Sequence, residues 1–446
     1  MTLSDNDSFS SARPSSQLEL ADDSVAAEPV AADSGLSRIF RAARMLVINP
    51  EFRVILVCNV LMGLGSSFVM PFQSMWGTLE VGMSLRLFGV FMTVTAIANM
   101  AISTVVSQRS DTRYSRRSVL LTGAASAALG YLGYAVIREL WVLFLIGSLL
   151  LGLASVTFSQ LFAYARELVN RSSIPPSEAP LYMSTFRMCF ALSWTVGPAI
   201  ASMALAHLSY VGLFGGAALL YLALYLMVLW RIPKSAAPER PPVEGVAPPI
   251  VPMSQLLKVD MVLSWFIALA LLFTANTISM GNMSLYVMKV LGGTERHVGI
   301  IFSLAPVFEI PLMLYFGLLA TRTDSAKLIR ISALLAVLYY FAVSLVHAPW
   351  QIYPLQILSA AIVSVTSGVA ISFFQNMLPH QSGAATNLYV NAMRVGSTSG
   401  YLLFGTLAAR FGHRGTYSAC AALSLASLFM MFIWGRSRSR LGFART

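Results

Sequence analysis

The sequence predicts an all-α integral membrane protein with twelve transmembrane helices in two pseudo-symmetric bundles of six. Three observations predict this fold class. Of the 446 residues, 57% are hydrophobic and only 11% are charged, whereas a soluble domain carries about 25% charge. Twelve apolar runs each have roughly the length needed to cross a hydrocarbon core. A polar, proline-rich segment over 231–260 divides these runs into six and six.

The apolar runs begin after Arg53, and each must be helical because lipid offers an exposed backbone no hydrogen-bond partner. A membrane β-barrel would alternate apolar and polar residues along short strands, which these runs do not. A soluble enzyme, a nucleic-acid-binding protein and a disordered scaffold are excluded, since a soluble chain this apolar could not cover its surface with polar groups. The predicted spans are 53–76, 86–107, 118–137, 141–165, 184–207, 210–230, 261–288, 297–320, 331–347, 350–374, 385–409 and 416–434.

The domain organisation follows from this division. Residues 1–37 hold seven acids, one base and few large apolar side chains, so we expect a disordered acidic cytoplasmic tail rather than a signal peptide. The first six-helix bundle then covers 53–230 and the second covers 261–434. A cytoplasmic linker over 231–260 joins them, and a basic cytoplasmic tail follows over 435–446.

The distribution of Lys and Arg predicts the orientation. With the N-terminus inside, 22 of these residues fall on the cytoplasmic side and six on the other, while Arg187 and Arg394 lie within spans. Basic residues accumulate in cytoplasmic loops. We therefore expect both termini in the cytoplasm, and the net charge of +11 needs no nucleic acid to explain it.

Similar short sequences also occur at corresponding places in the two halves. MGLGSSF (62–68) resembles MGNMSLY (280–286), and FGVF (88–91) resembles VGII (298–301). The two span arginines, Arg187 and Arg394, each lie near the start of an apolar run. The three offsets are similar and occur in the order that a six-span duplication predicts.

The loop between the second and third spans carries a recognisable motif. SQRSDTRYSRR (107–117) resembles the loop signature of the major facilitator superfamily, with Asp111, Arg113, Arg116 and Arg117 at its charged positions. Ser107 stands where the superfamily usually has glycine, and a threonine follows Asp111 where it usually has arginine. The resemblance implies an acid–base cluster that latches helix ends together in one conformation. An ordinary basic cytoplasmic loop is the alternative interpretation.

Four further blocks resemble the bacterial sugar efflux transporter family within that superfamily, and the resemblance covers nearly all of 53–434. It implies a multi-pass protein of the bacterial inner membrane, a major facilitator fold, and efflux of simple sugars or glycosides driven by protons. The implied partners are a small sugar, protons and the bilayer, with the chain a monomer and no cofactor, metal or nucleic acid. The blocks are SQLFAYARELVNRS (159–172), FRMCFALSWTVGPAIA (186–201), FEIPLML (308–314) and FFQNMLPHQSGAATNLYVNAMRVG (373–396).

Charged side chains within the hydrocarbon region are costly and mark function. Glu309 is the only acid near the middle of a predicted span, and Arg394 lies at a similar depth in another. We predict that these two residues carry proton coupling, with Arg394 as the charge partner of Glu309 or a donor to sugar hydroxyls. The alternative is that Glu309 only holds its helix, where the nearby Pro311 leaves the backbone in need of support.

Sugars are bound by hydrogen bonds to polar side chains and by stacking on an aromatic ring. Amides are sparse in spans because each is costly unless it is paired, so the amides here predict a polar cavity. A helix–helix hydrogen bond explains any single amide equally well, packing explains the tryptophan, and snorkelling to the interface explains Arg187. The candidate substrate-binding residues are Asn59, Gln73, Asn99, Gln160, Arg187, Trp194, Asn276, Asn282, Asn387 and Asn391.

Catalytic motifs do not occur in the sequence. The five histidines are scattered, the three cysteines lie inside apolar runs, and neither a zinc-protease, a nucleophile-elbow nor a Walker motif occurs. We therefore expect no enzyme and no ATP-driven pump. Two alternatives stay open. One keeps the fold but changes the transport: an exporter of drugs or other small molecules, or an uptake permease. The other is a transport-inactive membrane sensor.

Overall fold

The computed structural model describes residues 41, 44–110, 115–172, 174–175, 178–234, 260–378 and 382–437. The predicted acidic tail over 1–37 lies outside this part of the chain. So do Asp111 and Arg113 of the loop signature, the predicted linker over 231–260 except for its two ends, and most of the predicted basic tail over 435–446.

Helices make up the regular structure of the described residues, which contain no strand. The elements are α2 (Pro50–Val69), η1 (Met70–Phe72), α3 (Gln73–Met75), η2 (Trp76–Glu80), α4 (Leu85–Ser110), α5 (Arg116–Val136), α6 (Leu140–Leu145), η3 (Ile146–Leu150), α7 (Leu151–Ala154), α8 (Val156–Arg171), α9 (Ala179–Arg231), α11 (Asp260–Lys289), α12 (Glu295–Ala320), α13 (Ser325–Leu345), η4 (Pro349–Gln351), α14 (Ile352–Ser364), η5 (Val365–Val369), α15 (Ala370–Met377) and α16 (Ser382–Ser437).

The spans agree with the prediction once the two longest helices are divided. The described residues form ten helices that are long and apolar enough to cross a membrane. Two of them, α9 and α16, are about twice the usual length, and each contains one residue with a non-helical backbone, Ser209 and Gly412. Dividing α9 and α16 there yields twelve spans. The predicted fold class is confirmed.

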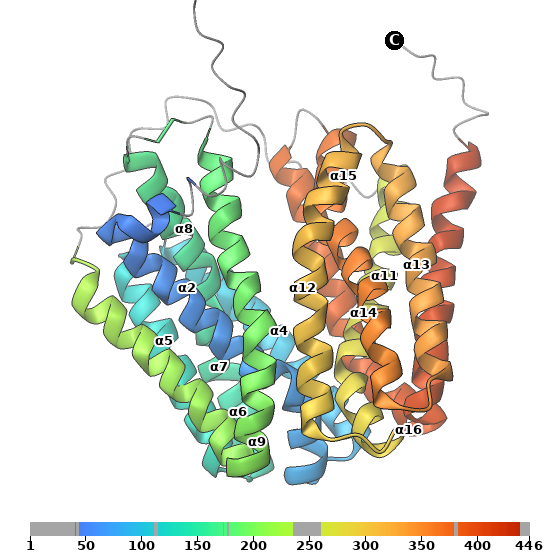
Figure 1. Cartoon of the computed structure of the whole chain (residues 1–446), viewed down its shortest axis with the longest axis horizontal. Coiled ribbons are helices and arrows are strands. Elements are labelled where there is room, and N and C mark those ends of the chain that lie inside the picture. Colours follow the sequence, from blue (N-terminus) through green and yellow to red (C-terminus); the bar gives the residue numbers. More distant parts are fainter. Residues whose placement is uncertain are drawn as a thin grey trace, which may run out of the picture.

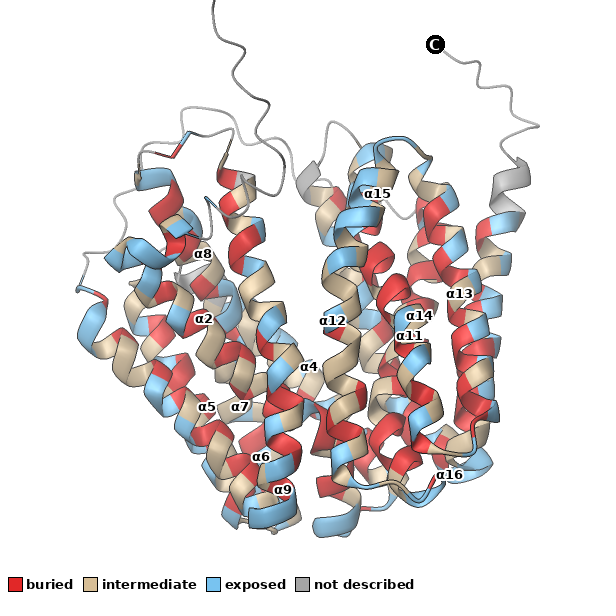
Figure 2. Ribbon diagram, in the orientation of Figure 1, coloured by how far each residue is buried: buried red, intermediate tan, exposed pale blue. Residues whose placement is uncertain are grey.

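Large apolar side chains cover the outside of the molecule. Trp141, Leu219 and Phe429 are 78%, 66% and 64% exposed. Figure 2 shows exposed residues along the outer faces of the helices and buried ones between them. An exposed apolar surface of this extent would not stay in water, and it matches the hydrocarbon core of a bilayer.

The helices form two bundles, one from α2 to α9 and the other from α11 to α16, as Figure 1 shows. The two bundles contact each other through α9 with α12 and through α4 with α16. We call the end at which α2, α5 and α11 begin the terminal end; it is uppermost in Figure 1. The opposite end, which carries the turns at Gly82, Ser209, Gly292 and Gly412, is the turn end.

The four turns repeat between the halves. Gly82 and Gly292 close equivalent turns with φ of 78° and 62°. Ser209 and Gly412 divide equivalent helices with φ of 54° and 69°. Positive φ is readily adopted by glycine and is costly for serine. This shared geometry supports the repeat that the sequence offsets indicated.

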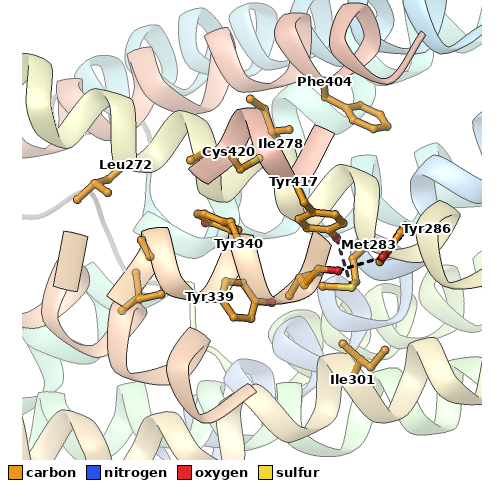
Figure 3. Packing of buried hydrophobic residues seen from close by; sticks show 14 of the residues in the cluster. Leu272, Ile278, Met283, Tyr286, Ile301, Tyr339, Tyr340, Phe404, Tyr417 and Cys420 are labelled. Carbon is orange, nitrogen blue, oxygen red and sulfur yellow. Dashed lines mark hydrogen bonds between the residues drawn. The ribbon is translucent and has the colours of Figure 1, made fainter. Parts of the chain in front are cut away.

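Buried apolar residues form two clusters, one confined to the N-terminal half and a larger one that includes residues of both halves. The part of the larger cluster that lies in the C-terminal half includes Tyr286, Tyr339, Tyr340, Tyr417 and Cys420, each at most 4% exposed (Figure 3). The Tyr286 hydroxyl donates a hydrogen bond of 3.0 Å to the carbonyl of Val343, which ties α11 to α13. Tyrosine in this core thus supplies both apolar area and a satisfied polar group.

Candidate functional site

A cavity of about 660 Å³ lies between the two halves. The N-terminal half contributes the first part of α9, and the C-terminal half contributes α11, α12, α13 and α14. Among its lining residues, Met283, Ile301 and Tyr339 are seen in Figure 3. The other polar or charged lining residues are Ser184, Thr185, Arg187, Trp194, Asn276, Ser279, Glu309, Gln356 and Ser359.

Two opposite charges enter this cavity from opposite halves. Arg187 comes from α9 and Glu309 from α12, and the Arg187 guanidinium acts electrostatically on the Glu309 carboxyl. The same guanidinium also acts electrostatically on the hydroxyl group of Tyr389 in α16. Arg394, the partner predicted for Glu309, is half-buried on α16. Of the two span arginines, the described lining includes Arg187 and not Arg394.

The predicted residues Trp194 and Asn276 also line the cavity, and both keep hydrogen-bonding capacity for a ligand. Trp194 Nε1 is buried and has no partner within the described part of the chain. The Asn276 amide makes one long contact of 3.9 Å to the sulfur of Met280, which is a weak acceptor. A ligand that accepts from an indole and bonds to an amide would satisfy both groups.

The helix that carries Glu309 is locally weakened and then supported from outside. Pro306 and Pro311 lie inside α12, so the carbonyls of Phe302 and Val307 lack their usual helical donors. The Ser364 hydroxyl donates to the backbone carbonyl of Glu309 at 3.2 Å and ties α14 to α12 at this level. The backbone contact leaves the carboxyl of Glu309 itself available to the cavity.

The prediction missed part of the lining. Gln356 is 3% exposed, and its Nε2 donates to the Tyr339 hydroxyl at 3.4 Å. Ser279 and Ser359 lie on the neighbouring surface of the cavity. Gln356 carried the same signal as the predicted amides, an amide inside a span. Serine and tyrosine are common in spans, so their presence in the sequence gave no such signal.

Three of the predicted amides make contacts between helices. Asn59 Nδ2 donates to the carbonyl of Phe186 at 2.7 Å. Asn282 Nδ2 donates to the carbonyl of His413 at 2.8 Å, and its Oδ1 lies 2.7 Å from His413 Nδ1. Gln160 Oε1 accepts a hydrogen bond of 3.2 Å from Arg116. These contacts join α2 to α9, α11 to α16, and α5 to α8.

The other four predicted amides lie elsewhere. Gln73 and Asn99 line a smaller pocket that the N-terminal half forms together with Tyr401 of α16. Asn387 is exposed on α16 and Asn391 is half-buried on the same helix, both outside the described lining of the cavity.

The described part of the loop signature does join helix ends at the terminal end. Arg116, at the start of α5, forms an ion pair with Glu167 of α8. Arg117 donates from Nε to the carbonyl of Ile232 at 2.7 Å and from Nη2 to the carbonyl of Leu229 at 2.8 Å. These bonds hold the last turn of α9 against the start of α5 and satisfy carbonyls that the helix end leaves open.

The two halves approach closely at the turn end. A Cβ added to Gly299 of α12 would lie 2.7 Å from the carbonyl oxygen of Pro198 in α9. Ser284 of α11 donates a hydrogen bond to the carbonyl of Pro71 in η1. The cavity lining, in contrast, extends to Leu181 near the start of α9, toward the terminal end. The halves therefore meet at one end and enclose space toward the other.

Twelve spans in two repeated halves, around a largely apolar cavity that also carries charged and hydrogen-bonding groups, define a membrane transporter rather than an enzyme. The family described as the Major Facilitator Superfamily matches residues 55–401 and 265–445. The chain belongs to the Major Facilitator Superfamily and, within it, to the bacterial sugar efflux family.

Two relatives and one solved structure illustrate this membership. A Deinococcus radiodurans protein named for sugar efflux is 32% identical over 86% of this chain and 97% of its own length. Sugar efflux transporter A of Escherichia coli is 27% identical over 86% of this chain and 96% of its own length. The crystal structure of the nucleoside transporter NupG is 15% identical with a TM-score of 0.71, covering 86% and 99% of the two chains. This last likeness shows the shared fold.

Proposed function

We propose that this protein exports simple sugars or glycosides from the cytoplasm across the bacterial inner membrane, in exchange for protons, by alternating access of its two halves. The observation that carries the proposal is the cavity between the halves, with Arg187 and Glu309 facing it from opposite sides. The names of the relatives support sugar as the cargo and efflux as the direction.

The chemistry of the lining supports a neutral hydroxylated cargo. The amides of Asn276 and Gln356 and the hydroxyls of Ser279 and Ser359 supply donors and acceptors. Trp194 adds a ring face and an unpartnered N–H. A volume of about 660 Å³ lies within the range of small-molecule sites, roughly 300–1,000 Å³. Apolar residues such as Met188, Phe302 and Ile310 form the rest of the lining and offer contact area to the C–H groups of a sugar ring.

For the proton we propose Glu309 as the carrier and Arg187 as the charge that opposes it when the carboxyl is ionised. A single acid facing a cavity inside the membrane is the typical element of a proton relay. Arg394 stays a prediction, and the assay below tests it alongside Arg187.

We further propose that the terminal end faces the cytoplasm and that the chain works as a monomer. The 22 Lys and Arg assigned to that side support this orientation. The structure then corresponds to a state whose cavity extends toward the cytoplasm, from which an exporter must load.

The test uses inside-out membrane vesicles with an acidified lumen and radiolabelled lactose or glucose outside. Export appears as uptake into the vesicles. We expect wild-type uptake that an uncoupler abolishes and that Glu309→Gln reduces at least tenfold. Arg187→Gln should reduce it as well, and Arg394→Gln tests the partner that the sequence predicted.

The matched control is Glu295→Gln, which removes an acid from the first turn of the same helix, outside the cavity lining. It should transport like wild type. Full uptake by Glu309→Gln would reduce Glu309 to a structural role. Uptake that survives the uncoupler would overturn proton coupling. Absence of sugar uptake would redirect the search to drugs, other solutes, an uptake permease or a sensor.

A further inference from the structure

A pocket separate from the cavity lies at the terminal end of the N-terminal half. It has a volume of about 420 Å³ and is lined by the segment that leads into α2, the first turn of α2, the start of α5, the end of α8 and the residues that follow α9. Its described lining shares no residue with that of the cavity. We call it the basic pocket because Arg116, Arg117 and Arg171 line it. The function proposed above assigns it no ligand.

Positive charge exceeds negative charge in the described lining of the basic pocket. Its three arginines face two acids, Glu51 and Glu167. Glu167 forms its ion pair with Arg116. Arg117 is held by two backbone carbonyls, which orient its guanidinium and leave its full charge in place. Arg171 is the last residue of α8 and is exposed, so a carboxylate that approaches from outside the membrane can reach it.

The surroundings of the basic pocket strengthen its positive charge. At the terminal end of the N-terminal half, the described side chains comprise nine Lys and Arg against three acids, Glu51, Glu167 and Glu178, a net charge of +6. The equivalent end of the C-terminal half has three bases against Asp324 among its described side chains, a net charge of +2. The positive field is therefore strongest around the basic pocket. The six bases outside its lining are Arg41, Arg44, Arg53, Arg166, Arg231 and Lys234.

The chain itself carries a segment of matching chemistry. Residues 1–37, which lie outside the described part, hold seven acids and one base, a net charge of −6. Within them the acids are densest in LELADD (18–23), which also holds two leucines. Carboxylates are the groups that a guanidinium binds in bidentate geometry. Phe52, Leu168 and Pro233 in the pocket lining offer apolar contact area to the leucines.

The acidic tail joins the described structure beside the basic pocket. Met45 and Asn49, which lead from the tail into α2, both line the pocket. Asp23 precedes Met45 by 22 residues. A chain of that length has a root-mean-square end-to-end distance of about 26 Å and an upper limit of about 75 Å. LELADD is thus within reach, and its tether gives it an effective concentration of about a millimolar at the pocket.

We propose that LELADD of the acidic tail docks in the basic pocket as an intramolecular counter-ion. Its carboxylates bind Arg117 and Arg171, and its leucines lie against the apolar part of the lining. Docking has a consequence for the alternating access proposed above. Both halves are positively charged at the terminal end, so the docked tail weakens their mutual repulsion and favours the arrangement in which the terminal ends meet.

Distances between spin labels test docking directly in the purified full-length protein. In a background where the three native cysteines are replaced by alanine, Ser24→Cys follows LELADD and Asn170→Cys is exposed in the last turn of α8. Double electron–electron resonance should show one short, narrow distance between the two labels. Replacing Glu19, Asp22 and Asp23 by their amides, or Arg171 by Gln, should abolish it. Replacing Asp5, Asp7 and Asp33 by Asn removes the same charge elsewhere in the tail and is the matched control, with the short distance retained. Thermal unfolding of each variant verifies the fold.

Two outcomes would overturn docking. A broad distance distribution in the wild-type tail would mean that LELADD does not bind, and equal loss in both triple variants would mean that only bulk charge matters. The measurement is then repeated in nanodiscs of phosphatidylcholine with and without phosphatidylglycerol. The short distance should persist in both. Its loss only with phosphatidylglycerol would identify an anionic lipid as the occupant and overturn the proposal.

The consequence for transport has a separate readout. In the vesicle assay above, the variant with amides at Glu19, Asp22 and Asp23 should take up sugar at least twofold more slowly than the control triple variant. Equal uptake would overturn the effect on closure. The distance measurement requires no transport, so a failure of the proposed sugar export and a failure of docking are distinguishable.

Discussion

Gly89 of α4 and Gly405 of α16 face each other across the boundary between the halves. A Cβ added to either glycine would lie 3.1 Å from the Cα of the other. Small residues let membrane helices approach to backbone contact, where dispersion and weak C–H contacts accumulate. This pair is therefore part of what closes the turn end, together with Gly299 and its neighbour Pro198.

Gly405→Ala should open the turn end. The added methyl would meet backbone that cannot rotate away, so α4 and α16 must separate. We expect at least tenfold slower transport and a longer distance between spin labels at Arg86→Cys and Arg410→Cys, measured by double electron–electron resonance. Gly215→Ala, at a position with open space around it, is the control. An unchanged label distance in Gly405→Ala would refute this role.

The ion pair between Arg116 and Glu167 should couple α5 to α8. Both side chains are partly exposed, so a double-mutant cycle on thermal stability should return a coupling of about 1 kcal/mol or less. Glu167→Gln should slow transport by weakening one conformation, and the exchanged pair Arg116→Glu with Glu167→Arg should recover part of the rate. Full activity in both single variants would contradict a latch.

Ser209→Gly should stabilise the protein. Ser209 has φ of 54° and ψ of −164°, a region that side-chain-bearing residues seldom enter. Relief of this conformation should raise the free energy of unfolding by about 1 kcal/mol. The reverse change, Gly412→Ser, should lower it at the equivalent turn. Unfolding midpoints in detergent measure both, and a destabilised Ser209→Gly would show that the serine contributes contacts worth more than the strain.

Asn282→Leu should reduce stability without changing affinity for cargo. Its amide exchanges two hydrogen bonds with His413 across α11 and α16, and their loss should cost about 1–3 kcal/mol. Asn276→Leu, six residues earlier and in the cavity lining, should raise KM instead. A comparison of unfolding midpoint and KM in the two variants separates structural from ligand-binding amides. A higher KM in Asn282→Leu alone would reverse the assignment.

The fold could be predicted because lipid imposes helices on every apolar run long enough to span it. The least visible boundary was the turn at Ser209, where two predicted spans are only two residues apart, whereas Arg410, His413 and Arg414 mark the turn at Gly412. A single residue with positive φ makes each turn. Amino-acid composition does not show which residue adopts a positive φ. Serine at one of the two positions indicates such a turn even less than glycine does.

The site was predicted only in part, for a geometric reason. The position of a polar residue within an apolar run shows how deep in the membrane it lies, but not which side of the helix it occupies. Asn276 and Asn282 are separated by about 240° around their helix, so one lines the cavity and the other bonds to a neighbouring helix. The same limit applies to Arg187 and Arg394, because depth in a span did not indicate that Arg187 lines the cavity with Glu309. Helix rotation is set by tertiary packing.

The placement of Arg187 and Glu309 on different halves has a thermodynamic consequence. Their mutual attraction is a term in the free energy between the two arrangements of the halves, and it exists only while the carboxyl is ionised. If Glu309 carries the proton, each protonation deletes that term and each release restores it. Ionisation of Glu309 changes the equilibrium between the two arrangements by some factor. By linkage, the change of arrangement must alter the proton affinity of Glu309 by the same factor. The proton gradient would then drive the movement of the two halves through the ionisation of one carboxyl.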